Sequence, residues 1–432
     1  MQSYSRFIFD SYDLDSTNHT IKLNYSLDDQ INFTETLQLP RSLDLEQPNS
    51  TVTAALFALH LAGGVSYYKL FLPKTIEIRS GELSHQQADF WDALYQHGLG
   101  EFFYHNNIDF RDLIHFPVTA TTEIQGKTIT ETHVPKRALV PFGGGKDSIV
   151  TSELLKSRGI SQTLFRVRSH PFITKLAQTA NLQLLEIERI LDPQLYKLNA
   201  AGAYNGHVPV TAYISFLSVV TALFGGYDTV IFSNERSSSY GNLDYLGMTI
   251  NHQWSKSLEF ETSIRTYISR YITPSVAYDN LLRNTSELKI AKLFSQYPQY
   301  FEQATSCNRN WTVLSTMPDA SRWCGKCPKC AFSFALFSAY LPANKLIDMF
   351  GLNLLENQTL LPLYQELWGE NGFKPFECVG TPEETQAALY LASKNPDFTN
   401  SFIIKAFNTS SLPNISNPEQ LVSGLLSTEP KL

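Results

Sequence analysis

The chain has 432 residues, more than one hydrophobic core usually supports, so two or three domains are expected. Its 43% hydrophobic share is that of a soluble globular protein, and no segment approaches the roughly 18–20 apolar residues that span a bilayer. The formal net charge of −7 argues against bulk electrostatic binding of nucleic acid. The first ten residues lack the basic stretch and long apolar run of a secretory signal. We therefore expect a cytoplasmic protein with neither a membrane nor a nucleic-acid partner.

The first region, residues 1–135, alternates short apolar stretches with polar turns, which predicts an N-terminal α+β domain. Three stretches are typical of an antiparallel sheet: residues 4–12, 20–27 and 33–39. Residues 52–62 are apolar on most sides and predict a buried helix, which we expect Gly63 and Gly64 to end. A second helix is predicted over residues 86–98.

In the second region, residues 136–300, predicted strands alternate with predicted helices. The strands are expected at residues 137–141, 162–167, 183–187 and 229–232, and the helices at 148–158, 174–179 and 208–224. This alternation indicates a parallel sheet covered by helices on both faces, so the chain is placed in the α/β class. Ligands of such sheets bind beyond the carboxyl ends of the strands, here residues 143–148, 166–169 and 233–239.

The third region, residues 301–432, contains a cysteine cluster followed by helical patterns at residues 331–340 and 343–350. The tail after Asn408 is rich in Ser, Pro and Asn, and we expect it to be frayed.

The most informative stretch is a Gly-rich turn between a predicted strand and a predicted helix. It consists of Gly143, Gly144, Gly145, Lys146, Asp147 and Ser148. Three glycines allow the backbone N–H groups to approach phosphate oxygens, and the following helix adds the positive end of its dipole. Lys146 can neutralise charge on a leaving pyrophosphate, Asp147 suits Mg²⁺ or a ribose, and Ser148 can cap the helix or bind a phosphate.

This turn lacks the spacing of a Walker A loop and resembles the Ser-Gly-Gly-x-Asp-Ser signature of PP-loop ATP pyrophosphatases, with Gly143 in place of the first Ser. The resemblance implies the fold of the adenine nucleotide alpha hydrolases and a loop that binds the β- and γ-phosphates of ATP while chemistry occurs at the α-phosphate. ATP and Mg²⁺ are the expected ligands. The alternative is a strand–helix turn that binds nothing.

Four of the five cysteines have a spacing suited to one metal ion. They are Cys307, Cys324, Cys327 and Cys330. Four thiolates form a closed tetrahedral zinc site, and the two-residue gaps let neighbouring thiolates converge on one ion. An iron–sulfur cluster uses similar ligands, and free buried cysteines are a further alternative. Cys307 can instead belong to an active-site segment, and Cys378 is a further candidate for the metal or for proton transfer.

Several further polar segments have no packing rationale. They are Gly202-Ala-Tyr-Asn-Gly-His-Val-Pro-Val-Thr211, Phe232-Ser-Asn-Glu-Arg-Ser237, Asn251-His-Gln-Trp-Ser-Lys-Ser257, Ser306-Cys-Asn-Arg-Asn310, Arg322-Trp-Cys-Gly-Lys-Cys-Pro-Lys-Cys330 and Lys374-Pro-Phe-Glu-Cys-Val-Gly380. Residues 64–69 and the Gly-rich turn belong to the same pattern, which extends from about residue 55 to residue 385. Together these segments resemble the MurL family, whose members are UDP-N-acetylmuramoyl-L-alanyl-L-glutamate epimerases.

The resemblance implies a specific reaction. MurL enzymes invert the terminal L-glutamate of UDP-MurNAc-L-Ala-L-Glu to D-glutamate for peptidoglycan synthesis, using ATP and Mg²⁺ and releasing AMP and pyrophosphate. Transfer of AMP to the carboxylate gives a mixed anhydride, whose carbonyl can accept the charge of a Cα carbanion. A base then removes the Cα proton and an acid returns one to the other face.

Six side chains are candidates for the catalytic groups. They are His207, His252, Glu235, Arg236, Lys256 and Cys307. Histidine suits proton transfer near neutral pH, and an arginine after a strand end suits an anionic substrate. The alternatives are hydrogen-bonded structural histidines and a surface ion pair.

Two other functions fit parts of the same pattern. A PP-loop ligase or amidotransferase would form the same adenylate on another carboxylate, a nucleobase or a tRNA, and trap it with ammonia or sulfur. A regulatory module would bind the nucleotide without turnover. The lack of a basic run weighs against tRNA, and the many polar loops beside the Gly-rich turn weigh against a regulatory module.

Overall fold

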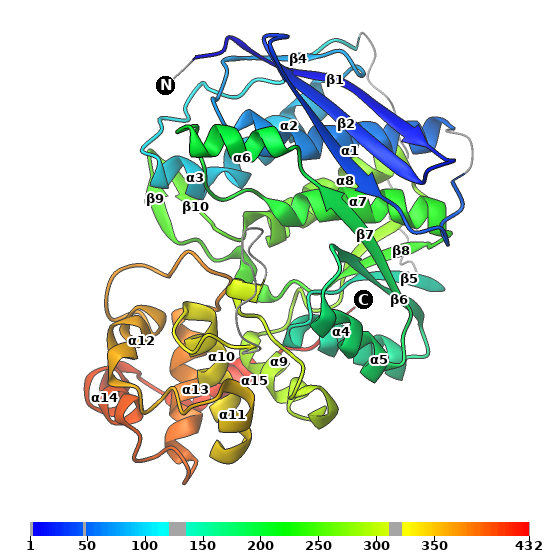
Figure 1. The fold of residues 1–432 in the computed structure, drawn as a ribbon. Helices are drawn as coiled ribbons and strands as arrows, with labels where there is room; N and C mark the ends of the chain where they lie inside the picture. The colour runs from blue at the N-terminus through cyan, green and yellow to red at the C-terminus, as the bar shows by residue number, and fades with distance from the viewer. Residues whose placement is uncertain (1–2, 46–48, 121–134, 311–321, 432) are drawn as a thin grey trace.

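The computed structural model describes residues 3–45, 49–120, 135–310 and 322–431 (Figure 1). Within these ranges, the centre of the molecule is one sheet of nine strands. They are β1 (Arg6–Asp15), β2 (Thr20–Leu27), β3 (Ile31–Gln38), β4 (Thr75–Ile78), β5 (Arg137–Pro141), β6 (Ser161–Val167), β7 (Leu184–Ile190), β8 (Thr229–Phe232) and β11 (Ala277–Asn280). Their order across the sheet is β11-β8-β5-β6-β7-β3-β2-β1-β4. A separate ribbon pairs β9 (Leu243–Tyr245) with β10 (Met248–Ile250).

The half of the sheet formed by β5, β6, β7, β8 and β11 is entirely parallel, which confirms the predicted α/β alternation. Successive side chains of each strand enter opposite cores. Leu139 packs into one core cluster, whereas its neighbours Ala138 and Val140 pack into the other. Both faces are therefore covered by helices, as a parallel sheet requires.

The other half of the sheet is an antiparallel meander of β1, β2 and β3, at the three places where the sequence predicts strands. The meander joins the parallel half directly, because β3 pairs antiparallel with β7, with Thr36 opposite Ile190. The proposed boundary between the first two domains, at residue 135, adjoins residues 121–134, which lie outside the described ranges.

Helices lie on the two faces of the sheet in separate sets. One core cluster contains residues of α1 (Ser50–Tyr68), α2 (His85–Gly98), α3 (Gly100–His105), α7 (Val210–Gly225) and α8 (Leu258–Tyr267). The other contains residues of α4 (Lys146–Ser157), α5 (Pro171–Ala180) and α9 (Glu287–Phe294). The short helix α6 (Pro193–Ala200) follows β7.

The prediction that Gly63 and Gly64 end the first helix is wrong, because α1 continues through both to Tyr68. The helix packs so closely on the sheet that a Cβ atom at Gly63 would lie 2.5 Å from the hydroxyl of Tyr25, and one at Gly64 would collide with the ring of Phe9. Glycine is used here for close approach, and the packing offsets its low helix propensity.

The C-terminal region is a helical layer, drawn in yellow to red below the sheet in Figure 1. It consists of α10 (Pro328–Ser338), α11 (Ala343–Phe350), α12 (Leu361–Leu367), α13 (Pro382–Lys394), α14 (Phe402–Ser410) and α15 (Pro418–Leu426). The two helices predicted here, at residues 331–340 and 343–350, are confirmed as α10 and α11.

The predicted fraying of the tail after Asn408 is wrong. Val422 and Leu425 of α15 are buried, and the amide of Lys431 donates to the carbonyl of Leu281 at 3.0 Å. The polar residues of the tail cap this helix, since the Asn417 side chain accepts from the amide of Gln420. Among the described residues, no helix combines the length and apolar character that a membrane span requires.

Candidate active site

The Gly-rich turn connects β5 to α4 as predicted. Gly144 has φ of +76°, and a Cβ atom there would collide with Ile173, so this position requires glycine. The Ser148 hydroxyl holds the turn together, because it accepts from the amide of Gly144 at 3.1 Å and donates to the carbonyl of Gly145 at 3.1 Å. No side chain caps the first turn of α4. The positive end of this helix is thus available to an anion.

The turn lies where the strand order reverses. β5 has β6 on one side and β8 on the other, and the chain crosses from β7 to β8 over the sheet. The carboxyl ends of β5 and β8 therefore form the crevice in which such sheets bind ligands. The hydroxyl of Ser233, directly after β8, is buried in this crevice without a hydrogen-bond partner among the described residues.

Three carboxylates surround the turn. Lys146 is buried, with Nζ 2.8 Å from Asp147 Oδ1 and in an ion pair with Glu287, the first residue of α9. Glu235, which follows β8, completes a set in which one oxygen each of Asp147, Glu235 and Glu287 lies within 4.8 Å of the others. Burial raises the pKa of Glu287. Three carboxylate oxygens are the donors that Mg²⁺ prefers, so the set fits a divalent cation.

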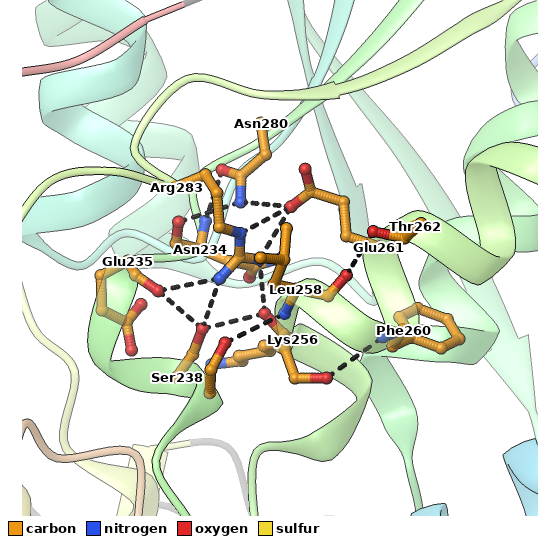
Figure 2. A network of polar contacts seen from close by, with 12 residues as sticks. Asn234, Glu235, Ser238, Lys256, Leu258, Phe260, Glu261, Thr262, Asn280 and Arg283 are labelled. Atoms are coloured by element: carbon orange, nitrogen blue, oxygen red, sulfur yellow. Dashed lines mark hydrogen bonds and ion pairs between the residues drawn. The ribbon is translucent and has the colours of Figure 1, made fainter.

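A buried arginine fixes the backbone on both sides of this site (Figure 2). Arg283 binds the Glu261 carboxylate at 2.8 Å and donates to the carbonyls of Glu235 at 3.0 Å and Lys256 at 2.6 Å. Ser238 bonds to the same two carbonyls through its hydroxyl. The guanidinium therefore donates to the backbone carbonyls of two separate turns, and it fixes the positions of Glu235 and Lys256 relative to each other.

The two histidines predicted as catalytic lie together around one carboxylate. The rings of His207 and His252 are 4.5 Å apart between centroids. The Nδ1 atom of His252 is hydrogen-bonded to Glu101 Oε2, and the Nδ1 atom of His207 lies 3.4 Å from the same oxygen. His252 also hydrogen-bonds Cys378, whose sulfur accepts from the Nζ atom of Lys256 at 3.4 Å.

The contacts within this cluster shift the pKa values of His207, His252 and Cys378 in different directions. Burial opposes the charged form of His252, but its hydrogen bonds to Cys378 and Glu101 prevail and raise its pKa to about 9. Burial and the charge of His252 lower the pKa of His207 to about 4. Burial also opposes the Cys378 thiolate, but Lys256, Lys329 and His252 lower the pKa of this thiol well below its usual value. These shifts favour the charged forms of His252 and Cys378 and the neutral form of His207.

The four clustered cysteines meet as predicted. One ligand atom of each lies within 4.8 Å of the others, with Sγ–Sγ distances of 3.9 Å (Cys307–Cys327), 3.7 Å (Cys324–Cys330) and 3.4 Å (Cys327–Cys330). Tetrahedral zinc with Zn–S bonds of about 2.3 Å requires sulfurs about 3.8 Å apart. The spacing therefore fits one metal ion such as zinc. An iron–sulfur cluster would distribute its ligands over several irons and hold them farther apart.

The metal cluster and the two polar sites are joined by residues 305–308. The amide of Thr305 donates to the carbonyl of Gly144 at 3.1 Å, and Ser306 packs against Gly145. Cys307 follows in the metal cluster, and the side-chain amide of Asn308 donates to Glu377. One short segment thus contacts the Gly-rich turn, carries one of the four clustered cysteines and binds the neighbour of Cys378.

The structure distributes the predicted catalytic residues over different places. His207, His252 and Lys256 lie in one cluster, Glu235 lies with the carboxylates near Lys146, and Cys307 lies in the metal cluster. The side chain of Arg236 is exposed. Two residues of the site, Glu101 and Glu287, were missed, since each stands in an ordinary amphipathic helix and meets its partners only in the folded chain.

The structure thus combines an α/β fold with a Gly-rich turn at the reversal of strand order, a set of three carboxylates beside it and a separate cluster of two histidines, a glutamate and a cysteine, as expected of an α/β enzyme. Comparison with known proteins also identifies an enzyme family. Residues 1–281 match the MurL N-terminal domain, and residues 303–421 match the MurL C-terminal domain. The chain belongs to the MurL family, and it is an epimerase of an amino-acid derivative.

Three relatives carry the name UDP-N-acetyl-alpha-D-muramoyl-L-alanyl-L-glutamate epimerase. The protein of Xanthomonas oryzae pv. oryzae is 36% identical over 427 residues, which cover 98% of this chain and 94% of the relative. The protein of Micromonospora sp. is 37% identical over 412 residues, 93% of this chain and 89% of the relative. The protein of Salinispora tropica is 36% identical over 405 residues, 93% of this chain and 87% of the relative.

Proposed function

We propose that this protein adenylates the terminal L-glutamate of UDP-MurNAc-L-Ala-L-Glu with ATP, which releases pyrophosphate, and inverts the Cα centre of the adenylate. Water then hydrolyses the mixed anhydride to give AMP and the D-glutamate epimer. The substrate is taken from the names of the relatives. The observation that carries the ATP-dependent step is the Gly-rich turn at the reversal of strand order, with Lys146 and three carboxylates beside it.

The residues around the turn fit Mg²⁺ and a triphosphate. Asp147, Glu235 and Glu287 would hold Mg²⁺, which neutralises phosphate charge when bound. The glycine amides and the uncapped start of α4 would bind phosphate oxygens. Lys146 already lies against two of the carboxylates, and its ammonium is placed to stabilise the pyrophosphate that leaves.

Activation explains why an epimerase needs ATP. Removing a Cα proton beside a carboxylate would place a second negative charge next to the first. In the mixed anhydride with AMP, the carbonyl group accepts the charge of the carbanion instead. Lys256 links the two halves of the reaction, because it contacts Cys378 and its pKa is also raised by the charges of Glu235 and Asp147. Two buried lysines, Lys69 and Lys374, add cationic groups for an anionic substrate. Burial lowers the pKa of both, that of Lys69 to about 8.

The test is incubation in D₂O with UDP-MurNAc-L-Ala-L-Glu, Mg²⁺ and either ATP or an analogue. Deuterium at Cα, D-glutamate and equimolar AMP and pyrophosphate are expected with ATP. The β,γ-methylene analogue should support the reaction, because its α–β bond is intact for cleavage, and the α,β-methylene analogue should not. Release of ADP and phosphate, or epimerisation with the α,β-methylene analogue, would contradict the adenylate. AMP release with unlabelled L-glutamate would point to the ligase or amidotransferase alternative.

A further inference from the structure

One cysteine lies outside the metal cluster, and the structure places it in the acid–base cluster. Of the five cysteines, Cys378 alone is not among the four whose sulfurs converge. It accepts a hydrogen bond from Lys256 and shares one with His252, whose ring is bound to Glu101. We propose that the Cys378 thiolate is the base that removes the Cα proton of the glutamyl residue, an inference that rests on the proposed function.

The other members of the cluster are poorly suited to this step. His252 lies between Glu101 and Cys378 and is held as the imidazolium, so it has no free lone pair. His207 has a pKa of about 4, which makes it a weak base. Glu101 is shared by both rings and has a lowered pKa, since its bonds to the histidines outweigh burial. Lys256 is an ammonium that donates a hydrogen bond to Cys378, so it has no lone pair with which to accept the Cα proton. Cys378 is the remaining base, and a soft thiolate paired with cations is ionised at neutral pH.

The thiolate is connected to the proposed adenylation site by two routes. Lys256 contacts the sulfur and responds to the charges of Glu235 and Asp147 beside the Gly-rich turn. The neighbour of Cys378, Glu377, is bound by Asn308, in the segment that also packs on the turn. Cys378 is half-buried, and Lys256 and His252 lie beside it.

The step balances within these residues. The Cα–H bond breaks as the S–H bond forms, and the electron pair moves into the acyl carbonyl to give an enolate. The positive charges of Lys256 and His252 stabilise that oxyanion. A proton returns to the opposite face of Cα from the histidine pair, His252 and His207. Transfer of the thiol proton to His252 across their hydrogen bond then restores the thiolate and the imidazolium.

The first test separates the two half-reactions in Cys378→Ala and Cys378→Ser. Substrate-dependent exchange of labelled pyrophosphate into ATP reports adenylation, and deuterium uptake at Cα reports proton transfer. We expect both variants to retain the exchange near the wild-type rate and to lose deuterium uptake by at least about 100-fold. Uptake at the wild-type rate in either variant would overturn the role of Cys378. Absence of the pyrophosphate exchange in the wild-type protein would instead refute the proposed function.

The second test measures the thiolate without turnover. At pH 6.5 an ordinary thiol of pKa about 8.5 is only about 1% ionised, so it reacts slowly with iodoacetamide. Peptide mapping should find Cys378 alkylated much faster than free cysteine, and Lys256→Met should slow this reaction. A rate equal to that of free cysteine would overturn the proposal. So would a substrate thioester on Cys378 in the intact-mass spectrum of acid-quenched enzyme, because it would make the sulfur a nucleophile.

Discussion

The cysteine cluster offers the sharpest stability prediction. Structural zinc sites contribute about 10–16 kcal/mol, so each of four thiolates carries about 2.5–4 kcal/mol. Replacing buried Cys330 by serine should therefore weaken zinc binding roughly 10²- to 10³-fold. Cys378→Ser is the matched control, because this cysteine lies outside the four converging sulfurs and its loss should leave the zinc content at one per chain.

The assay is the metal content of each purified protein, by mass spectrometry, after dialysis against chelators of graded strength. Cys330→Ser should lose zinc to a chelator that leaves the wild-type protein loaded. It should also bind ATP more weakly, because the segment that carries Cys307 contacts Gly144 and Gly145. Zinc retention by Cys330→Ser at the wild-type level would refute the reasoning, as would equal loss in both variants. Iron in place of zinc would refute the identity of the metal.

Three further predictions concern the polar sites. Gly144→Ala should lower the free energy of unfolding by about 1–2 kcal/mol because of the positive φ at this position, and it should abolish ATP binding in calorimetry by displacing the turn. Gly159→Ala is the control, because Gly159 also has a positive φ but open space around it, and this variant should retain ATP binding. Glu101→Gln removes an anion that favours the imidazolium, so the pKa of His252 should fall from about 9 by roughly one to two pH units in a histidine NMR titration. An unchanged pKa would show that Glu101 does not set it. Arg283→Met removes one of three partners of the buried Glu261 carboxylate, which keeps Arg265 and Asn280. The lost charged hydrogen bond should cost about 1–3 kcal/mol and lower the Tm by about 1–3 °C; an unchanged Tm in calorimetry would count against the network in Figure 2.

Local patterns predicted the parts of the molecule that local interactions determine. The strand, turn and helix around Gly144 are contiguous in sequence, and their glycines and alternating apolar residues are sufficient to indicate them. The cysteine spacing likewise predicted a convergence that the structure confirms. The error at Gly63 has the opposite origin, since its glycine serves a contact with Tyr25, 38 residues earlier along the chain (63 minus 25), which no local pattern reveals.

The acid–base cluster could not be assembled from sequence for the same reason. His252 meets Glu101 across 151 residues and Lys256 meets Cys378 across 122. Histidine is a recognisable candidate because its chemistry is rare, but a glutamate in a helix resembles the many that face solvent. Only the packing of α3 beside the loop that carries His252 distinguishes Glu101 from them.

The pairing of β3 with β7 has a consequence for how the chain avoids aggregation. A parallel sheet that ended at β7 would expose a seven-residue edge strand to other molecules. The meander covers that edge and transfers the ends of the sheet to β4 and β11, which have only four residues each. Short edge strands offer few unpaired backbone groups as a template for another chain. The N-terminal meander therefore protects the parallel half of the sheet from edge-to-edge association.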